Sequence, residues 1–372
     1  MKQDLLNLTK EMVAIRSVSN DGNTEISDYI EVWLKVIGFD EIERLEYTYK
    51  GGAPKVNLVA RKGMVSGGLA FISHSDTVPG MEETWDAFHP VVKNGRLYGR
   101  GSCDIKGPLA ATMTAAAAVD ATQLKAPLYV VVTADEEIGL YGAKYVVKHS
   151  RLLNDAGPDY GVVAEPTRLI PAYGHKGYAF IKVIAHGKAA HTSSGEGVSS
   201  NFLIAPFLTD MMTLNERFQN DPAFMNDEFQ PPTNGFNMVI TDDGQPSMTA
   251  AKTECVLTLR VMPEAGTEEI IDLITEKAQN YGLEVAMARV TPPVYTDRKS
   301  NLVRAACQAT GNNQPETIPF ATEGIHYRQL MDLVILGPGD IAMAHTVGES
   351  IGVAELEKAV DVYANMIEAL CM

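Results

Sequence analysis

Cysteine is scarce in this sequence. The 4 cysteines lie far apart, form no CxxC pair and are too few for a disulfide framework. We therefore expect reduced thiols in a cytoplasmic protein. The pattern gives no support to thiolate chemistry.

Long apolar runs are missing too. No segment offers the roughly 18 consecutive apolar residues of a membrane-spanning helix. Charges interrupt residues 1–16, which lack the apolar stretch of a signal peptide. The sequence therefore predicts neither a membrane span nor a secretion signal.

Positive charge is in short supply. Lys and Arg number 31 against 47 Asp and Glu, which gives a net charge of −16. This excess of negative charge repels phosphate backbones and anionic lipids, so we expect no nucleic-acid and no membrane partner. Most of the acids are simply solvated surface, and only a few need a chemical role.

The 372 residues, 45% of them hydrophobic, favour two domains or one large domain with an insertion. Helical patterns at 5–15 and 26–36 precede short apolar runs at 56–60, 69–72, 128–133 and 160–163. Helical stretches at 109–119 and 142–149 alternate with these runs. This alternation predicts an α/β fold with a mostly parallel sheet and helices on both faces.

The alternation of apolar runs and helical stretches changes at residues 174–177, where glycines bound a His-Lys pair. Beyond them we expect strands at 178–185, 236–240, 255–261 and 283–290, with helices at 202–218 and 268–281. After residue 290 a helix at 301–310, an apolar run at 333–336 and a helix at 353–370 follow. We predict a catalytic domain made of residues 1–174 and 291–372, with residues 175–290 inserted as a smaller α/β lid domain.

Acids and histidines stand where the predicted strands end. They are His74 with Asp76, Asp135 with Glu136 and Glu137, Glu165, and His345, while Asp104 lies between glycines ahead of a helix. Taken singly, each is more simply a solvated, capping or structural residue. Ligands bind outside the carboxyl ends of the strands in open α/β sheets, so we expect these side chains to converge. Such a dense charge cluster is costly unless a cation compensates it.

Two histidines and three carboxylates suit a pair of zinc ions or similar borderline metals. Adjacent residues at a strand end point to opposite sides, so Glu136 and Glu137 take different roles. We interpret Glu137 as a metal ligand and Glu136 as the general base for the attacking water. Asp76 is expected to hold the far nitrogen of His74, and Asp135 to be a turn or capping residue.

These residues resemble the M20 metallopeptidase family over nearly the whole chain. The matching segments are 73–79, 99–102 with 104–107, 133–137, 165–167 and 344–345. The family groups acetylornithine deacetylases, succinyl-diaminopimelate desuccinylases, aminoacylases and carboxypeptidases. The resemblance implies a hydrolase of linear amides with two divalent ions, zinc first and cobalt second, and a homodimer formed through the inserted domain.

The resemblance also implies a role for individual residues. Asp104 would bridge both metals, His74 and Glu165 would complete one site, Glu137 and His345 the other, and Glu136 would be the base.

Two further residues receive roles in the inserted domain from the same resemblance. His191, in the segment 187–192, would stabilise the oxyanion, often from the partner subunit; by itself it is an ordinary loop histidine. Arg260 would grip the substrate carboxylate; its simpler interpretation is a surface strand arginine.

Within the family, segments 165–169, 175–177 and 336–339 look most like acetylornithine deacetylases, enzymes of arginine biosynthesis. The expected substrate is then an N-acyl amino acid such as N-acetylornithine. Segments 243–245 and 249–252 and Gly348 depart from that subgroup's pattern, which affects side-chain specificity and leaves the metal residues intact.

Three alternatives remain beside this hypothesis. A dipeptidase, carboxypeptidase or desuccinylase of the same family would use the same metals and base. A non-catalytic binding protein is disfavoured because Glu136 is present. A nucleotide-binding protein is disfavoured because Asp104 stands where a GxGxxG motif beginning at Gly99 needs its third glycine.

Overall fold

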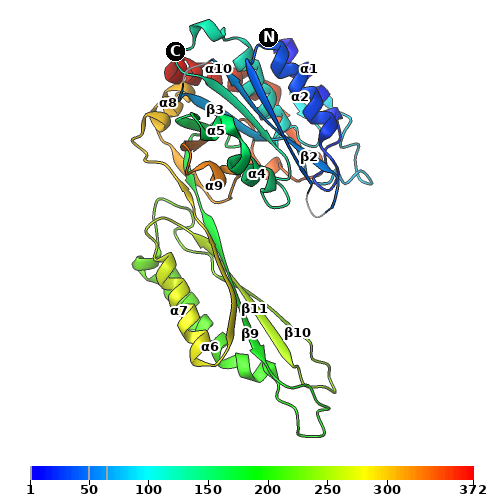
Figure 1. The fold of residues 1–372 in the computed structure, drawn as a ribbon, viewed down its shortest axis with the longest axis vertical. Coiled ribbons are helices and arrows are strands. Elements are labelled where there is room, and N and C mark those ends of the chain that lie inside the picture. Colours follow the sequence, from blue (N-terminus) through cyan, green and yellow to red (C-terminus); the bar gives the residue numbers. More distant parts are fainter. Residues whose placement is uncertain (1, 49–50, 64–65) are drawn as a thin grey trace. The chain divides into compact units, whose positions relative to one another are not determined.

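The computed structural model describes residues 2–48, 51–63 and 66–372 (Figure 1). The chain divides into two compact units. Unit 1 contains Met1–Gly174, Tyr295–Glu316 and Thr322–Met372, and unit 2 contains His175–Val294 and Thr317–Ala321. Unit 1 is therefore assembled from segments on both sides of unit 2 in the sequence.

The larger sheet has nine strands in the order β1-β2-β6-β3-β7-β15-β8-β13, with β14 beside β8. Their bounds are β1 Glu41–Thr48, β2 Pro54–Lys62, β3 Leu69–His74, β6 Leu128–Thr133, β7 Tyr160–Val163, β8 Ala172–His175, β13 Val294–Tyr295, β14 Glu316–Ile318 and β15 Asp332–Ile335. The central strands β6, β3, β7 and β15 run parallel, and β1, β2 and β8 pair antiparallel at the flanks. The predicted α/β class with a mainly parallel sheet is confirmed.

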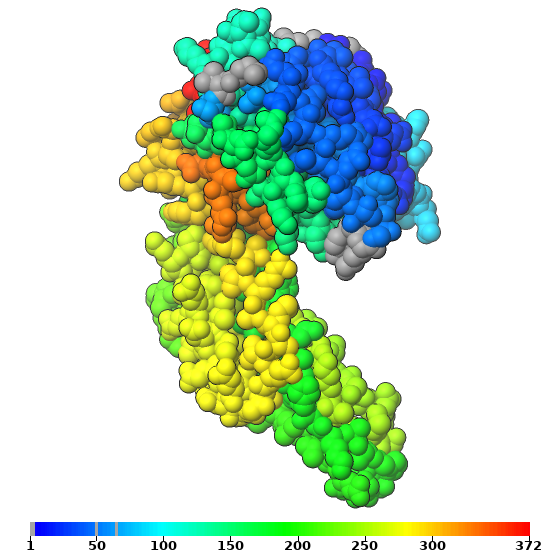
Figure 2. All heavy atoms as spheres, in the orientation of Figure 1, coloured from blue at the N-terminus to red at the C-terminus, as the bar shows by residue number. Residues whose placement is uncertain are grey.

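Helices cover both faces of this sheet. One face carries α1 Lys2–Ala14, α2 Thr24–Val36, α3 Lys106–Ala117, α8 Asn301–Thr310 and α10 Val353–Cys371, whose side chains share one core with Phe71, Val130 and Val162. The other carries α4 Tyr141–His149 and α5 Arg151–Asn154, with α9 Gly324–Tyr327 beside α4. Every residue of β3 and β6 is buried as a result, which explains their unbroken apolar runs. Little of the red helix α10 reaches the surface on the face drawn in Figure 2.

The register of the parallel strands places the predicted site at one edge. His74 pairs with Thr133, and Ile72 pairs with Val163, so β3, β6 and β7 end almost level. The strands β4 Val91–Lys93 and β5 Arg96–Tyr98, which precede the loop into α3, form a small sheet with β16 Ser350–Gly352. The single-turn helices η1 Ala121–Gln123 and η3 Ile341–Met343 complete this unit.

Unit 2 is built on an antiparallel sheet in the order β10-β11-β9-β12. Its elements are β9 Gly177–His186, α6 Ser200–Asn220, η2 Pro222–Phe224, β10 Asn237–Asp242, β11 Lys252–Val261, α7 Thr267–Asn280 and β12 Glu284–Thr291. Ile204, Phe207, Met211 and Leu214 recur at helical spacing in α6 and pack against the inward side chains of β9 and β11. Residues alternate between buried and partly exposed along β11, so one face of this sheet is covered by the helices.

No helix in the described part of the chain is long and apolar enough to be a candidate membrane span.

Candidate metal centre

Five of the predicted residues meet at the carboxyl edge of the larger sheet. His74 ends β3, Asp104 lies in the loop before α3, Glu137 follows β6, Glu165 follows β7 and His345 follows η3. They form two groups, His74 with Asp104 and Glu165, and Asp104 with Glu137 and His345, in each of which the ligand atoms lie within 4.8 Å of one another. Asp104 belongs to both groups.

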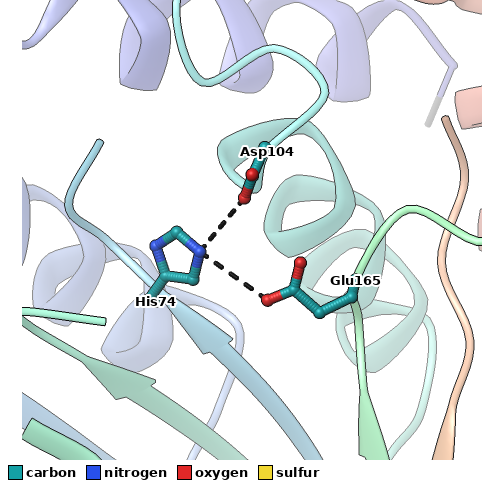
Figure 3. A group of neighbouring side chains, drawn as sticks. All are labelled: His74, Asp104 and Glu165. Carbon is teal, nitrogen blue, oxygen red and sulfur yellow. Dashed lines mark hydrogen bonds and ion pairs between the residues drawn. The ribbon is translucent and has the colours of Figure 1, made fainter. Parts of the chain in front are cut away.

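The distances fit divalent ions. His74 Nε2 lies 3.1 Å from Asp104 Oδ1 and 3.7 Å from Glu165 Oε1 (Figure 3). His345 Nε2 lies 3.3 Å from Asp104 Oδ2 and 3.0 Å from Glu137 Oε1. Oxygen and nitrogen ligands around one tetrahedral zinc ion lie about 3.4 Å apart. Asp104 thus presents one oxygen to each group, as a bridging carboxylate does.

Negative charge is concentrated in this centre. Burial raises the pKa values of Glu136, Glu137 and Glu165, and repulsion from neighbouring carboxylates raises them further. Hydrogen bonds to Asp104 and Glu137 raise the pKa of His345 to about 10. The protein's own groups therefore need extra positive charge here, which divalent ions would supply.

His74 is held by Asp76 through its backbone oxygen and, at longer range, through its carboxylate. Its Nδ1 lies 2.9 Å from the backbone oxygen of Asp76, and 3.5 Å from the carboxylate. The Nδ1–H therefore donates to a carbonyl and leaves Nε2 free to bind a metal. The carboxylate of Asp76 also accepts hydrogen bonds from Ser19 Oγ at 2.6 Å and from the backbone N–H groups of Glu136 and Glu137 at 3.2 and 3.3 Å. Asp76 thus orients both the histidine and the two glutamates.

The loop that carries Asp104 is fixed by Glu349, a residue for which the sequence analysis predicts no role. Glu349 is fully buried, and its Oε1 accepts the backbone N–H groups of Gly101, Cys103 and Asp104 at 3.0, 2.9 and 3.1 Å. Its Oε2 accepts a bond from the Arg100 guanidinium at 2.6 Å. The only indication of this role in the sequence is that Glu349 directly precedes the short strand β16 near the C-terminus.

Asp135 is more than the turn residue predicted from the sequence. Its side chain is fully buried, lies 2.8 Å from Lys55 Nζ and accepts a bond from Tyr47 Oη at 2.7 Å. Burial raises the pKa of Asp135, whereas Lys55 and Tyr47 lower it. The sequence offered one signal, a lysine at the start of the apolar run of β2.

His191 and Arg260 belong to unit 2. His191 lies in an exposed loop, with Nδ1 2.7 Å from Ser193 Oγ, and its backbone bridges to Met248 beside the hairpin between β10 and β11. Arg260 is exposed on β11, and its backbone N–H donates to Asn234. Their roles toward a substrate stay predictions.

The family model of peptidase family M20/M25/M40 matches residues 70–369. An acetylornithine deacetylase of Myxococcus xanthus is 35% identical and covers 97% of this chain and 96% of its own. One of Proteus mirabilis is 30% identical and covers 99% and 97%.

Several solved structures of similar fold are peptidases. A tripeptidase of Staphylococcus aureus covers 99% of this chain and 98% of its own, with a TM-score of 0.76 at 21% identity. An M20 metallo-carboxypeptidase of Sulfolobus solfataricus covers 98% of each chain, with a TM-score of 0.75 at 19% identity. A Bacillus subtilis peptidase of the M20 family, described as binding a dinuclear metal, covers 98% and 97% with a TM-score of 0.66 at 16% identity. The likeness extends over both units of the fold.

Proposed function

Because the chain belongs to peptidase family M20/M25/M40, whose members hydrolyse amide bonds, we propose that it removes an acyl group, most often acetyl, from an N-acylated amino acid. The position of Asp104, with one oxygen toward each ligand group, carries the proposal of a two-metal hydrolase. The names of the relatives from Myxococcus xanthus and Proteus mirabilis support N-acetylornithine as the first substrate to test.

Two divalent ions are proposed as cofactors, zinc first and cobalt second. His74, Asp104 and Glu165 would hold one ion, and Asp104, Glu137 and His345 the other. The dinuclear peptidase of Bacillus subtilis supports this pairing. When bound, such ions polarise the scissile carbonyl and lower the pKa of water to about 7.

Glu136 is the proposed general base. Its carboxylate accepts no hydrogen bond from the residues that the structure describes, while its backbone N–H is fixed by Asp76. Glu136 takes a proton from the attacking water as the new C–O bond forms, and returns it to the amine nitrogen as the C–N bond breaks. The products are the free amine of the amino acid and the carboxylate of the acyl group.

Two residues of unit 2 are proposed to complete the site. The imidazole of His191 would stabilise the oxyanion, and the guanidinium of Arg260 would bind the substrate carboxylate through paired hydrogen bonds. Both side chains belong to exposed residues, which leaves them accessible to a substrate.

A homodimer through unit 2 belongs to the same proposal. Phe202 and Met212 on α6 are 82% and 64% exposed, and Val239 on the edge strand β10 is 53% exposed. Apolar side chains at an open sheet edge favour pairing with a second chain. Sedimentation of the wild-type chain and of Phe202→Glu tests this interface, because only the wild type should sediment as a dimer.

The release of free amine from a panel of substrates tests the function. The panel contains N-acetyl, N-succinyl and N-formyl amino acids and dipeptides, with zinc or cobalt added and a chelator as control. Chelator-sensitive release from N-acetylornithine, and slower release from N-acetylnorleucine, would support the deacetylase and its preference for a charged side chain. Cleavage of dipeptides alone would move the activity to the peptidases, and no hydrolysis would contradict the proposal.

A further inference from the structure

Lys55 is a buried lysine outside the ligand set. It lies near the start of β2 and is 4% exposed. Its ammonium lies 2.8 Å from Asp135 Oδ1, and donates to the backbone oxygens of Ser19 and Asp21, the latter at 2.5 Å. The ammonium therefore has three close oxygen partners, two through hydrogen bonds and the third, Asp135, through an ion pair.

The buried ion pair of Lys55 and Asp135 is expected to add little to the free energy of unfolding. Moving two charges out of water costs several kcal/mol for each ion, and the attraction between them often does no more than offset that cost. The side chain of Asp135 is nevertheless 0% exposed, and the Lys55 side chain whose ammonium pairs with it is 5% exposed. A buried pair of this kind fixes geometry.

The ion pair with Asp135 connects Lys55 to Glu136 and Glu137 through the backbone. Asp135 has a φ of 56°, in the left-handed region that is unfavourable for a residue with a side chain, and it directly precedes Glu136 and Glu137. Lys55 and Tyr47 hold the Asp135 side chain from the strands β2 and β1. The turn after β6 therefore keeps its conformation because these partners hold it.

The hydrogen bond with Ser19 connects Lys55 to the same two glutamates by a second route. Lys55 holds the backbone of Ser19, whose hydroxyl donates to Asp76 Oδ2 at 2.6 Å. The carboxylate of Asp76 in turn accepts the N–H groups of Glu136 and Glu137. Two separate routes thus connect one ammonium group to the backbone of the proposed base and of a proposed metal ligand.

We propose that Lys55 is a positioning residue, which orients Glu136 and Glu137 through Asp135 on one side and through Ser19 and Asp76 on the other. The inference rests on the proposed hydrolase function. Loss of the ammonium lets the turn after β6 relax. The carboxylate of the base Glu136 then moves away from the attacking water, and the carboxylate of Glu137 moves from its position as a ligand. Substrate affinity depends on groups outside this network, so the effect falls on kcat more than on KM.

The test compares Lys55→Met and Asp135→Asn with a matched control, Lys62→Met. Lys62 lies on the same strand, is 2% exposed, and donates to the backbone oxygens of Ala116 and Val119 at 2.8 and 3.0 Å. Its removal also deletes a buried ammonium, but one with no contact to the turn after β6. Tyr47→Phe is a milder fourth variant, because it removes one hydroxyl and keeps the ring that stacks on Tyr145.

Kinetics and a cobalt spectrum are measured for each folded variant. We expect Lys55→Met and Asp135→Asn to lower kcat at least about tenfold with KM within about twofold, and Tyr47→Phe to lower kcat about threefold. The double variant should be no slower than the slower single variant, since both changes break one network. The visible absorption of the cobalt-loaded protein should shift in these variants and stay unchanged in Lys62→Met.

Two results would overturn the inference: a kcat for Lys55→Met and Tyr47→Phe equal to that of Lys62→Met, or a cobalt spectrum unaltered in all of them. Failure of the proposed function is recognised separately, because the wild-type chain would then bind no cobalt or hydrolyse no substrate of the panel. If Lys55→Met does not fold, Tyr47→Phe decides the question by the same two measurements.

Discussion

The carboxylate of Glu349 accepts the backbone N–H of Asp104 at 3.1 Å, although the two residues are 245 positions apart in the chain. The same carboxylate oxygen accepts two more N–H groups of that loop, and the other oxygen pairs with Arg100. A buried carboxylate with this many donors leaves the loop little freedom. The bridging position of Asp104 thus depends on a residue near the C-terminus.

Replacement of Glu349 by Gln should weaken metal binding by about 10- to 100-fold, the effect typical of residues that support metal ligands. In the carboxylate, one oxygen accepts the three backbone N–H groups and the other accepts Arg100. In the amide, one of these oxygens is replaced by an NH2 group, which cannot accept a hydrogen bond and faces either Arg100 or the three backbone donors. Competition with a chromogenic chelator measures the affinity. The matched control is Glu43→Gln, because Glu43 also accepts backbone N–H groups, at Arg151 and Leu152. Equal affinities in the two variants would refute the assignment.

The change Glu136→Gln separates catalysis from metal binding. We expect about two metals per chain to be retained, while hydrolysis falls at least about 100-fold, because the amide cannot take a proton from water. Metal analysis and steady-state kinetics on the same preparation measure both. Glu137→Gln serves as a contrast, since it should lower the metal content as well. Normal turnover in Glu136→Gln would remove this residue as the base.

The change His345→Ala should reduce the metal content toward one ion per chain. His345 contacts Asp104 and Glu137 at 3.3 and 3.0 Å but is not part of the group formed by His74 and Glu165. Elemental analysis after dialysis gives the stoichiometry. His149→Ala is the control, because His149 is exposed and packs on Tyr145. Two retained ions would exclude His345 as a ligand.

His175 should make the stability of the chain depend on pH. Its imidazole is fully buried and donates from Nδ1 to the backbone oxygen of Lys176, and burial lowers its pKa from 6.5 to about 4. The unfolded chain therefore takes up a proton first as the pH falls, so the stability present above pH 6.5 is lost toward pH 4.

The measurement is the free energy of unfolding at pH 7 and pH 5 for the wild type and for His175→Gln. Carboxylates titrate in both proteins, so the difference isolates the histidine. Between these two pH values the wild type should lose about 2 kcal/mol more than the variant, given the two pKa values and linkage. Equal losses would show that His175 is not buried in its neutral form.

The buried parallel strands of the fold were predictable from the sequence. The apolar runs at 128–133 and 160–163 coincide with β6 and β7, since strands buried on both faces give unbroken apolar segments. Strand β1 was missed because Glu41–Thr48 alternates charged and apolar residues at a sheet edge, where burial is partial along most of its length. The antiparallel flanks of the sheet were missed with it.

The convergence of His74, Asp104 and Glu165 followed from the rule that places sites at strand ends, and the structure brings these residues together. The supporting residues did not follow from it. Lys55 and Glu349 act through contacts across 80 and 245 positions, and no local pattern encodes which buried charge finds which partner. The hydrogen bond of His74 to the backbone carbonyl of Asp76 was likewise not predictable from local sequence.

The order of the segments has a consequence for biosynthesis. Strand β15 inserts between β7 and β8, and His345 and Glu349 follow it, so all three emerge from the ribosome after the whole of unit 2. Until β15 is synthesised, the sheet of unit 1 has no strand between β7 and β8. During that time the loop of Asp104 also lacks its hydrogen bonds to Glu349. Unit 2 forms its own sheet from one nearly continuous stretch and is free to fold first. A nascent chain halted before β15 should thus be captured by chaperones through its first 174 residues and hold no metal tightly, while release of the last segment triggers both closure of the sheet and metal loading.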